Sequence, residues 1–181
     1  VPAKKDCGPG EMRNPRQIAV VGVTGYTGLE LARILLRHPA LEPPVFYVRD
    51  TNGSKCLAGL FPQFRGWGEA PLRPLSVESI TSSNAGTVFL ATPHEVSAEM
   101  APAFLQAGLR VVDLSGAFRF RGAETFTSWY KLPAPHADWL SEAVYGIPEL
   151  YSKEIAEARL VANPGCYATS VILALRPLTD S

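Results

Sequence analysis

Short apolar runs alternate with longer amphipathic stretches along most of the chain. Each run is rich in Val, Leu, Ile or Phe and ends at polar residues, glycine or proline, which is typical of strands buried inside a sheet. This pattern predicts strands at residues 18–21, 45–48, 87–91, 110–114 and 159–162.

Between these runs, apolar residues recur at helical spacing. Residues 28–36 show it, and His38-Pro39 ends that segment because the residue before a proline disfavours helical backbone. Further helices are predicted at 97–106, 152–158 and 167–175, the last ending before Pro177. We interpret 49–86 as loop with weak structure, 118–148 as an irregular excursion rich in aromatics and proline, and 1–16 as a disordered lead.

Strands that alternate with helices usually form a parallel sheet covered on both faces. The sequence therefore predicts an α/β fold with a Rossmann-like, doubly wound parallel sheet. The chain has no net charge and 46% apolar residues, which allows a sizeable core and offers no basic surface for nucleic acid. No apolar run approaches the roughly 18–20 residues of a membrane span.

The cysteines bear on the compartment. Cys7, Cys56 and Cys166 are too scattered for a disulfide framework or a zinc site, so we expect a cytoplasmic protein without a bound metal. Residues 1–17 are polar and lack the apolar centre of a secretory signal.

A glycine-rich turn joins the first predicted strand to the first predicted helix. Its spacing is G-x-x-G-x-x-G rather than the dinucleotide fingerprint G-x-G-x-x-G. Glycines permit a tight turn and the approach of a pyrophosphate to the helix N-terminus. Because of this strand–turn–helix context, we favour cofactor binding over a turn without a ligand. The candidate residues are Gly22, Thr24, Gly25, Tyr26, Thr27 and Gly28.

The end of the second predicted strand bears on the choice between NAD and NADP. An acid there would bind a ribose 2′-hydroxyl, whereas an arginine would suit a 2′-phosphate. This chain has both, Arg49 followed by Asp50, and Ser54 and Lys55 stand in the polar loop beyond. By charge we favour NADP, with a solvated turn as the alternative.

Cys166 follows Pro164-Gly165 and begins the last predicted helix. A helix start presents free N–H groups and partial positive charge, which favour a thiolate over a thiol and can receive a developing oxyanion. The alternative is a buried structural cysteine, the common fate of a free Cys, and position alone leaves the two open. Cys7 and Cys56 are interpreted as bystanders.

The stretch 160–169, with Asn-Pro-Gly-Cys-Tyr at its centre, resembles the active-site signature of N-acetyl-gamma-glutamyl-phosphate reductases. Ser170 stands where that family usually has Gly or Ala. Glu95 replaces the glycine of its PHG-x-S block, and Ala117 lacks the acid of its DLSADFR block. The resemblance covers residue 17 to the end, and further similar blocks lie at 22–31, 61–66, 88–97, 112–119 and 145–150.

The resemblance implies a reaction. The thiolate of Cys166 attacks an acyl phosphate, phosphate leaves, and hydride from NADPH reduces the thioacyl enzyme to a semialdehyde in arginine biosynthesis. It also implies an NADP-binding domain over 17–162 and the start of a truncated α+β substrate domain over 163–181. This chain alone would then turn over poorly, because the family's acid/base histidine belongs to the second domain. The resemblance further implies that the full-length protein forms homo-oligomers.

Other polar residues near predicted strand ends are candidates for binding. Pro93 is a candidate cofactor contact, and Asn163 and Arg119 are candidate substrate contacts. Arg119 is preferred to Arg121 because it lies in a family-like block, and a surface ion pair is the alternative for either. His94 ends the third strand, where ligands bind in such sheets, and its alternative is a loop-stabilising role.

Two rival interpretations stay open. Lysine-pathway reductases of a carrier-bound aminoadipyl phosphate and aspartate-semialdehyde dehydrogenases share the covalent chemistry, and the Pro-Gly-Cys-Tyr block disfavours only the latter. A non-catalytic NADP-binding module would have the same fold without a reactive thiol.

Overall fold

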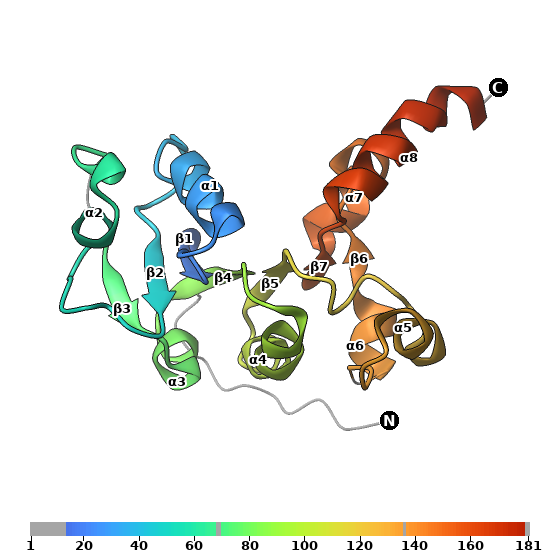
Figure 1. Ribbon diagram of the computed structural model, residues 1–181, viewed down its shortest axis with the longest axis horizontal. Helices are drawn as coiled ribbons and strands as arrows, with labels where there is room; N and C mark the ends of the chain where they lie inside the picture. The colour runs from blue at the N-terminus through green and yellow to red at the C-terminus, as the bar shows by residue number, and fades with distance from the viewer. Residues whose placement is uncertain (1–13, 68–69, 136, 180–181) are drawn as a thin grey trace.

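The computed structural model describes residues 14–67, 70–135 and 137–179. Its strands form one seven-stranded sheet with helices on both sides, and each strand pairs in parallel with its neighbours (Figure 1). The strands are β1 (Asn14–Val21), β2 (Val45–Val48), β3 (Leu72–Pro74), β4 (Ala85–Leu90), β5 (Arg110–Asp113), β6 (Val144–Tyr145) and β7 (Leu160–Ala162), in the spatial order β3-β2-β1-β4-β5-β7-β6.

Local sequence sets several helix ends. The Ser76 hydroxyl accepts a hydrogen bond from the Ser79 amide at 3.1 Å and caps a helix start, and Gly108, with φ +82°, follows a helix end. The helices are α1 (Tyr26–Leu35), α2 (Leu57–Leu60), the 3-10 helix η1 (Pro62–Phe64), α3 (Val77–Thr81), α4 (His94–Gln106), α5 (Ala123–Tyr130), α6 (Ala137–Glu142), α7 (Pro148–Glu157) and α8 (Cys166–Thr179).

The strand register aligns the carboxyl ends of the central strands. One row of paired residues crosses the sheet there and consists of Tyr47, Val21, Leu90, Asp113 and Ala162. Four are apolar or aromatic, as expected for strands buried on both faces, and the fifth is a carboxylate. Loops that follow these residues therefore meet along one edge of the sheet.

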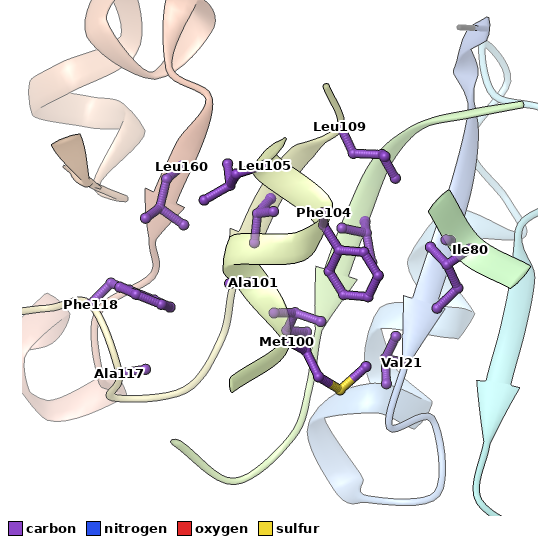
Figure 2. Close-up of a cluster of buried hydrophobic side chains, with 14 of the residues drawn as sticks. Val21, Ile80, Met100, Ala101, Phe104, Leu105, Leu109, Ala117, Phe118 and Leu160 are labelled. Carbon is purple, nitrogen blue, oxygen red and sulfur yellow. The ribbon is translucent and has the colours of Figure 1, made fainter. Parts of the chain in front are cut away.

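Alternating side chains build two cores, one on each face. On one face, Phe104 and Met100 of α4 and Ile80 of α3 pack with Val21 (Figure 2). On the other face, α1, α2 and η1 cover Ile18, Val20, Phe46, Val48 and Leu72 with Ala32, Leu35, Leu57 and Phe64. Coverage of both faces confirms the predicted doubly wound sheet.

Several boundaries differ from the sequence predictions. The prediction of 49–86 as loop is wrong, because α2, η1, β3 and α3 lie there, and 118–148 contains α5, α6 and β6. β1 begins at Asn14, inside the predicted lead, whereas residues 1–13, including Cys7, lie outside the described part. α8 continues through Pro177, since a proline in the last turn removes only one helical hydrogen bond.

The last helix differs from the others in its surroundings. α8 extends away from the sheet (Figure 1), and none of its described residues is buried. Its exposed apolar side chains are Tyr167, Val171, Leu175 and Leu178. Within residues 14–67, 70–135 and 137–179, no helix is both long and apolar enough to cross a membrane.

Candidate functional site

The turn between β1 and α1 needs two of its glycines for packing and leaves the third open. Gly22 has φ +88°, and a Cβ on Gly28 would lie 2.3 Å from the Gly22 carbonyl oxygen. Around Gly25, the N-cap of α1, the described residues place no atom within 4 Å of such a Cβ. The backbone there is open to an approaching ligand, as a pyrophosphate site requires.

A pocket of about 480 Å³ opens beside this turn. It brings together five of the predicted cofactor residues: Gly22, Thr24, Gly25, Arg49 and Pro93. The rest of its wall comes from Val21, Tyr47, Val48, Asp50, Leu75, Ala91, Thr92 and Val96.

Other predicted cofactor residues stand outside the pocket wall. Tyr26, Thr27 and Gly28 form the first turn of α1, and the Tyr26 side chain is 95% exposed on another side of the helix. Ser54 and Lys55 lie farther along the loop after β2. Leu75, Thr92 and Val96 also line the pocket and were not among the candidates from the sequence. Leu75 lies in a segment interpreted as loop, whereas Thr92 stands directly before Pro93 at a strand end.

In the loop after β2, Asp50 and Arg49 have different surroundings. The Asp50 carboxylate accepts a hydrogen bond from the Asn52 amide at 2.7 Å, which supports a turn where Asn52 and Gly53 both have positive φ. Asp50 therefore stabilises its own loop. Arg49 is exposed at the pocket wall, where a guanidinium suits a phosphate.

Cys166 is the first residue of α8, as predicted, and its side chain is exposed rather than buried. The first helical hydrogen bond runs from the Thr169 amide to the Gly165 carbonyl at 3.0 Å, so the amides of residues 166–168 have no helical acceptor. β7, which precedes this turn, lies two strand positions from β4, about 10 Å across the sheet. The cysteine and the pocket thus lie at the same edge of the sheet.

Arg119 is hydrogen-bonded to Asn163 in the turn that precedes Cys166. The Arg119 Nε atom donates to the Asn163 carbonyl at 2.9 Å, and Nη2 donates to the Leu114 carbonyl at 3.3 Å. The Asn163 side chain donates to the Pro164 carbonyl at 3.3 Å. Both predicted substrate residues therefore take part in the structure of the cysteine turn.

A buried carboxylate that the sequence analysis did not select lies beside this turn. Asp113 is fully buried at the end of β5, and its oxygens accept from the Ser115 amide at 3.1 Å and the Ser115 hydroxyl at 2.8 Å. Burial raises the pKa of Asp113, while hydrogen bonds from Ser115 and Ser97 and the charge of Arg119 oppose the rise. The Ser97 hydroxyl also contacts the Thr92 hydroxyl at 2.8 Å, which links Asp113 to the pocket wall.

His94 does not line the pocket that opens beside the glycine turn. Its ring stacks on Tyr130 with 5.4 Å between centroids, and it lines a separate pocket of about 230 Å³ with Phe126 and Leu132. His94 Nε2 lies 3.3 Å from a Glu95 oxygen without hydrogen-bond geometry, so this buried atom has no hydrogen-bond partner within the described residues. The stacking supports the loop-stabilising interpretation.

A doubly wound parallel sheet with a glycine turn and a pocket at its carboxyl edge defines a Rossmann-type dinucleotide-binding domain. Residues 17–158 match the family model of the semialdehyde dehydrogenase NAD-binding domain. The chain belongs to this semialdehyde dehydrogenase family.

Relatives within the family are named for related reductions. The chain is 43% identical over 164 residues to an N-acetyl-gamma-glutamyl-phosphate reductase of Pectobacterium carotovorum, covering 90% of this chain and 49% of the relative. It is 44% identical over 167 residues to a [LysW]-L-2-aminoadipate/[LysW]-L-glutamate phosphate reductase of Saccharolobus solfataricus, covering 92% and 47%. The chain thus spans about half the length of these relatives.

A solved structure shares the fold at low sequence identity. Aspartate semialdehyde dehydrogenase of Candida albicans, solved with NADP, superposes with a TM-score of 0.59 at 14% identity, covering 92% of this chain and 47% of that one. At this identity the likeness concerns the fold alone.

Proposed function

We propose that this chain is the NADP-binding half, with the nucleophilic cysteine, of a reductase that converts N-acetyl-glutamyl 5-phosphate to its semialdehyde in arginine biosynthesis. One observation carries the proposal: Cys166 is exposed at a helix start, at the same sheet edge as the dinucleotide pocket. The name of the Pectobacterium relative supports the choice of substrate.

The residues of the pocket fit a dinucleotide. The open backbone at Gly25 would admit the pyrophosphate, and the amides of the first turn of α1 would serve as its donors. Arg49 would bind the 2′-phosphate, with Ser54 and Lys55 in the same loop. Thr92 and Pro93 line the pocket after β4, the strand of the pocket that lies nearest to β7 in the sheet. When bound, NADPH supplies the hydride that reduces the acyl group.

The chemistry of the chain itself is at Cys166. The thiolate attacks the acyl carbon; a C–S bond forms, the bond from that carbon to the phosphate oxygen breaks, and phosphate leaves with the electron pair. The helix-start amides stabilise the oxyanion. Asn163 and the Nη1 atom of Arg119, which the hydrogen bonds of Arg119 to the Asn163 and Leu114 carbonyls do not use, bind polar groups of the substrate beside the sulfur. After hydride transfer the C–S bond breaks, which releases the aldehyde and restores the thiolate.

Activity is tested with the chain continued by the second half of the Pectobacterium relative, because the chain spans half that protein. We expect phosphate-dependent oxidation of N-acetyl-glutamate semialdehyde, lost by at least about 1000-fold in Cys166→Ser. Cys56→Ser is the matched control, since Cys56 is also an exposed free thiol, and it should retain activity. Full activity in Cys166→Ser would contradict the proposal and favour a non-catalytic NADP-binding module.

The lysine-pathway substrate is a second candidate, since the Saccharolobus relative is as similar to this chain as the Pectobacterium one. Competition between the N-acetylated and the carrier-bound phosphates decides between them. A kcat/KM ratio that favours the carrier-bound substrate would reject the arginine-pathway assignment.

We further propose that the full-length protein works in the cytoplasm as a homo-oligomer. The free exposed thiols Cys56 and Cys166 suit a reducing compartment, and the family resemblance supports the oligomer. Sedimentation analysis of the full-length protein tests the oligomer, and a monomer would reject it.

A further inference from the structure

We propose that Arg119 is a positioning residue that holds the turn carrying Cys166 against the carboxyl end of β5. We call the two hydrogen bonds that Arg119 donates, to the Asn163 and Leu114 carbonyls, the clamp. The purpose of the clamp rests on the proposed function, whereas its contacts do not. The guanidinium spans two carbonyls from different strand ends, Leu114 after β5 and Asn163 after β7. A planar fork of donors can bridge two acceptors in this way, and a lysine ammonium cannot reproduce that geometry.

The same peptide segment is held from its other sides. The Asn163 amide donates to the Asp113 carbonyl at 2.8 Å, so β5 and its loop bind both polar backbone groups of Asn163. On the β6 side, the Gly146 amide donates to the Ala162 carbonyl at 2.9 Å, and a Cβ on Gly146 would lie 3.2 Å from the Asn163 Cα. Asn163 therefore has little room to move while Arg119 is in place.

The clamp reaches the cysteine through two residues. Pro164 restricts the backbone after Asn163, and the Gly165 carbonyl accepts the first hydrogen bond of α8. A Cβ on Gly165 would lie 3.4 Å from Arg119 Nη1, so the arginine extends along the turn to the residue before Cys166. A shift of Asn163 would carry the start of α8, and the sulfur, with it.

Arg119 uses different nitrogen atoms to position the cysteine turn and to bind a charged group of the substrate. Nε and Nη2 are used by the turn, and Nη1 is the nitrogen that a substrate anion could share. Asp113, fully buried at the base of the same turn, is the nearby carboxylate that the Arg119 charge stabilises. The matched control is Arg121, which follows Arg119 closely in the same loop and is exposed.

The test measures alkylation of Cys166 in the 181-residue chain, with neutral iodoacetamide and anionic iodoacetate, and uses Cys56 in the same sample as the reference. In Arg119→Lys we expect both reagents to react about tenfold more slowly at Cys166, as expected for loss of a charged hydrogen bond. Amide exchange at Asn163 should quicken by a similar factor. Cys56 should be unaffected, and Arg121→Lys should match the unmodified chain.

Two outcomes would overturn the proposal. Unchanged alkylation and unchanged Asn163 exchange in Arg119→Lys would show that the turn does not need the clamp. A change with iodoacetate alone would assign Arg119 to anion binding. Arg119→Gln, judged by the same criteria, serves if the lysine variant does not fold. Neither reagent needs cofactor or turnover, so failure of the reductase assignment leaves these results interpretable.

Discussion

The glycines of the β1–α1 turn have separate physical roles that substitution can distinguish. A methyl group on Gly28 would meet the Gly22 carbonyl at 2.3 Å, which only movement of backbone can relieve. A methyl group on Gly25 would point into open space. The difference separates folding from cofactor binding at positions three residues apart.

Gly25→Ala should keep the melting temperature of the chain but weaken NADPH binding about tenfold or more, because the methyl group occupies the path of the pyrophosphate. Gly28→Ala should lower the free energy of unfolding by about 1–3 kcal/mol. Fluorescence titration with NADPH and thermal unfolding measure the two effects. Undiminished NADPH affinity in Gly25→Ala would place the cofactor elsewhere.

The buried carboxyl of Asp113 should make stability depend on pH. Its folded pKa is raised above the ordinary value of 3.8, so the folded state holds the proton more tightly than the unfolded state. The stabilising contribution is fully present below pH 3.8 and is lost as pH rises through the raised folded pKa. Compared with Asp113→Asn, the unmodified chain should therefore lose relative stability over that window.

Urea unfolding of both proteins at several pH values measures this difference. An isosteric amide keeps an acceptor for Ser115 and does not titrate, so it isolates the carboxyl. If the stability difference between the two proteins were constant with pH, the assignment of a raised pKa to Asp113 would be wrong.

At the scale of elements, the helices contribute unequally to stability. Phe104 of α4 is fully buried between the sheet and its neighbours (Figure 2). Tyr167 of α8, by contrast, is 87% exposed. Stability therefore resides in the sheet and its covering helices, while α8 presents the cysteine at its start.

Phe104→Ala should lower the free energy of unfolding by about 3–5 kcal/mol, through lost burial and the cavity left behind. Tyr167→Ala should change it by no more than about 0.5 kcal/mol. Denaturant unfolding compares the two variants. Equal losses would mean that α8 packs on the body of the chain in solution.

Element prediction succeeded where burial is two-sided. β2 was predicted to the residue because Val45–Val48 is buried throughout. β3 was missed because Arg73 and Pro74 of this short edge strand are exposed, so no apolar run marks it. The contact between Arg119 and Asn163 spans 44 residues and depends on β5 and β7 lying side by side. Sequence patterns indicate that strands exist, and not which strands are neighbours.

At the scale of the whole molecule, the parallel sheet brings two candidate sites to one edge. The pocket forms after β1, β2 and β4, and the cysteine follows β7. Both contain residues from motifs that stand directly after predicted strands, which is why these positions could be proposed from the sequence. The Asp113 network, by contrast, links the end of β5 and the loop after it to Ser97 of α4 and Thr92 before that helix, and no local motif marks it.

The role of Cys166 as the nucleophile is tested most directly by a mass measurement. The chain continued by the second half of the Pectobacterium relative is mixed with the acyl phosphate in the absence of NADPH, and its mass is measured. We expect one added acyl group per chain, located on Cys166 by peptide mapping, with one phosphate released. An unmodified Cys166, or an acyl group on Cys56 instead, would contradict it.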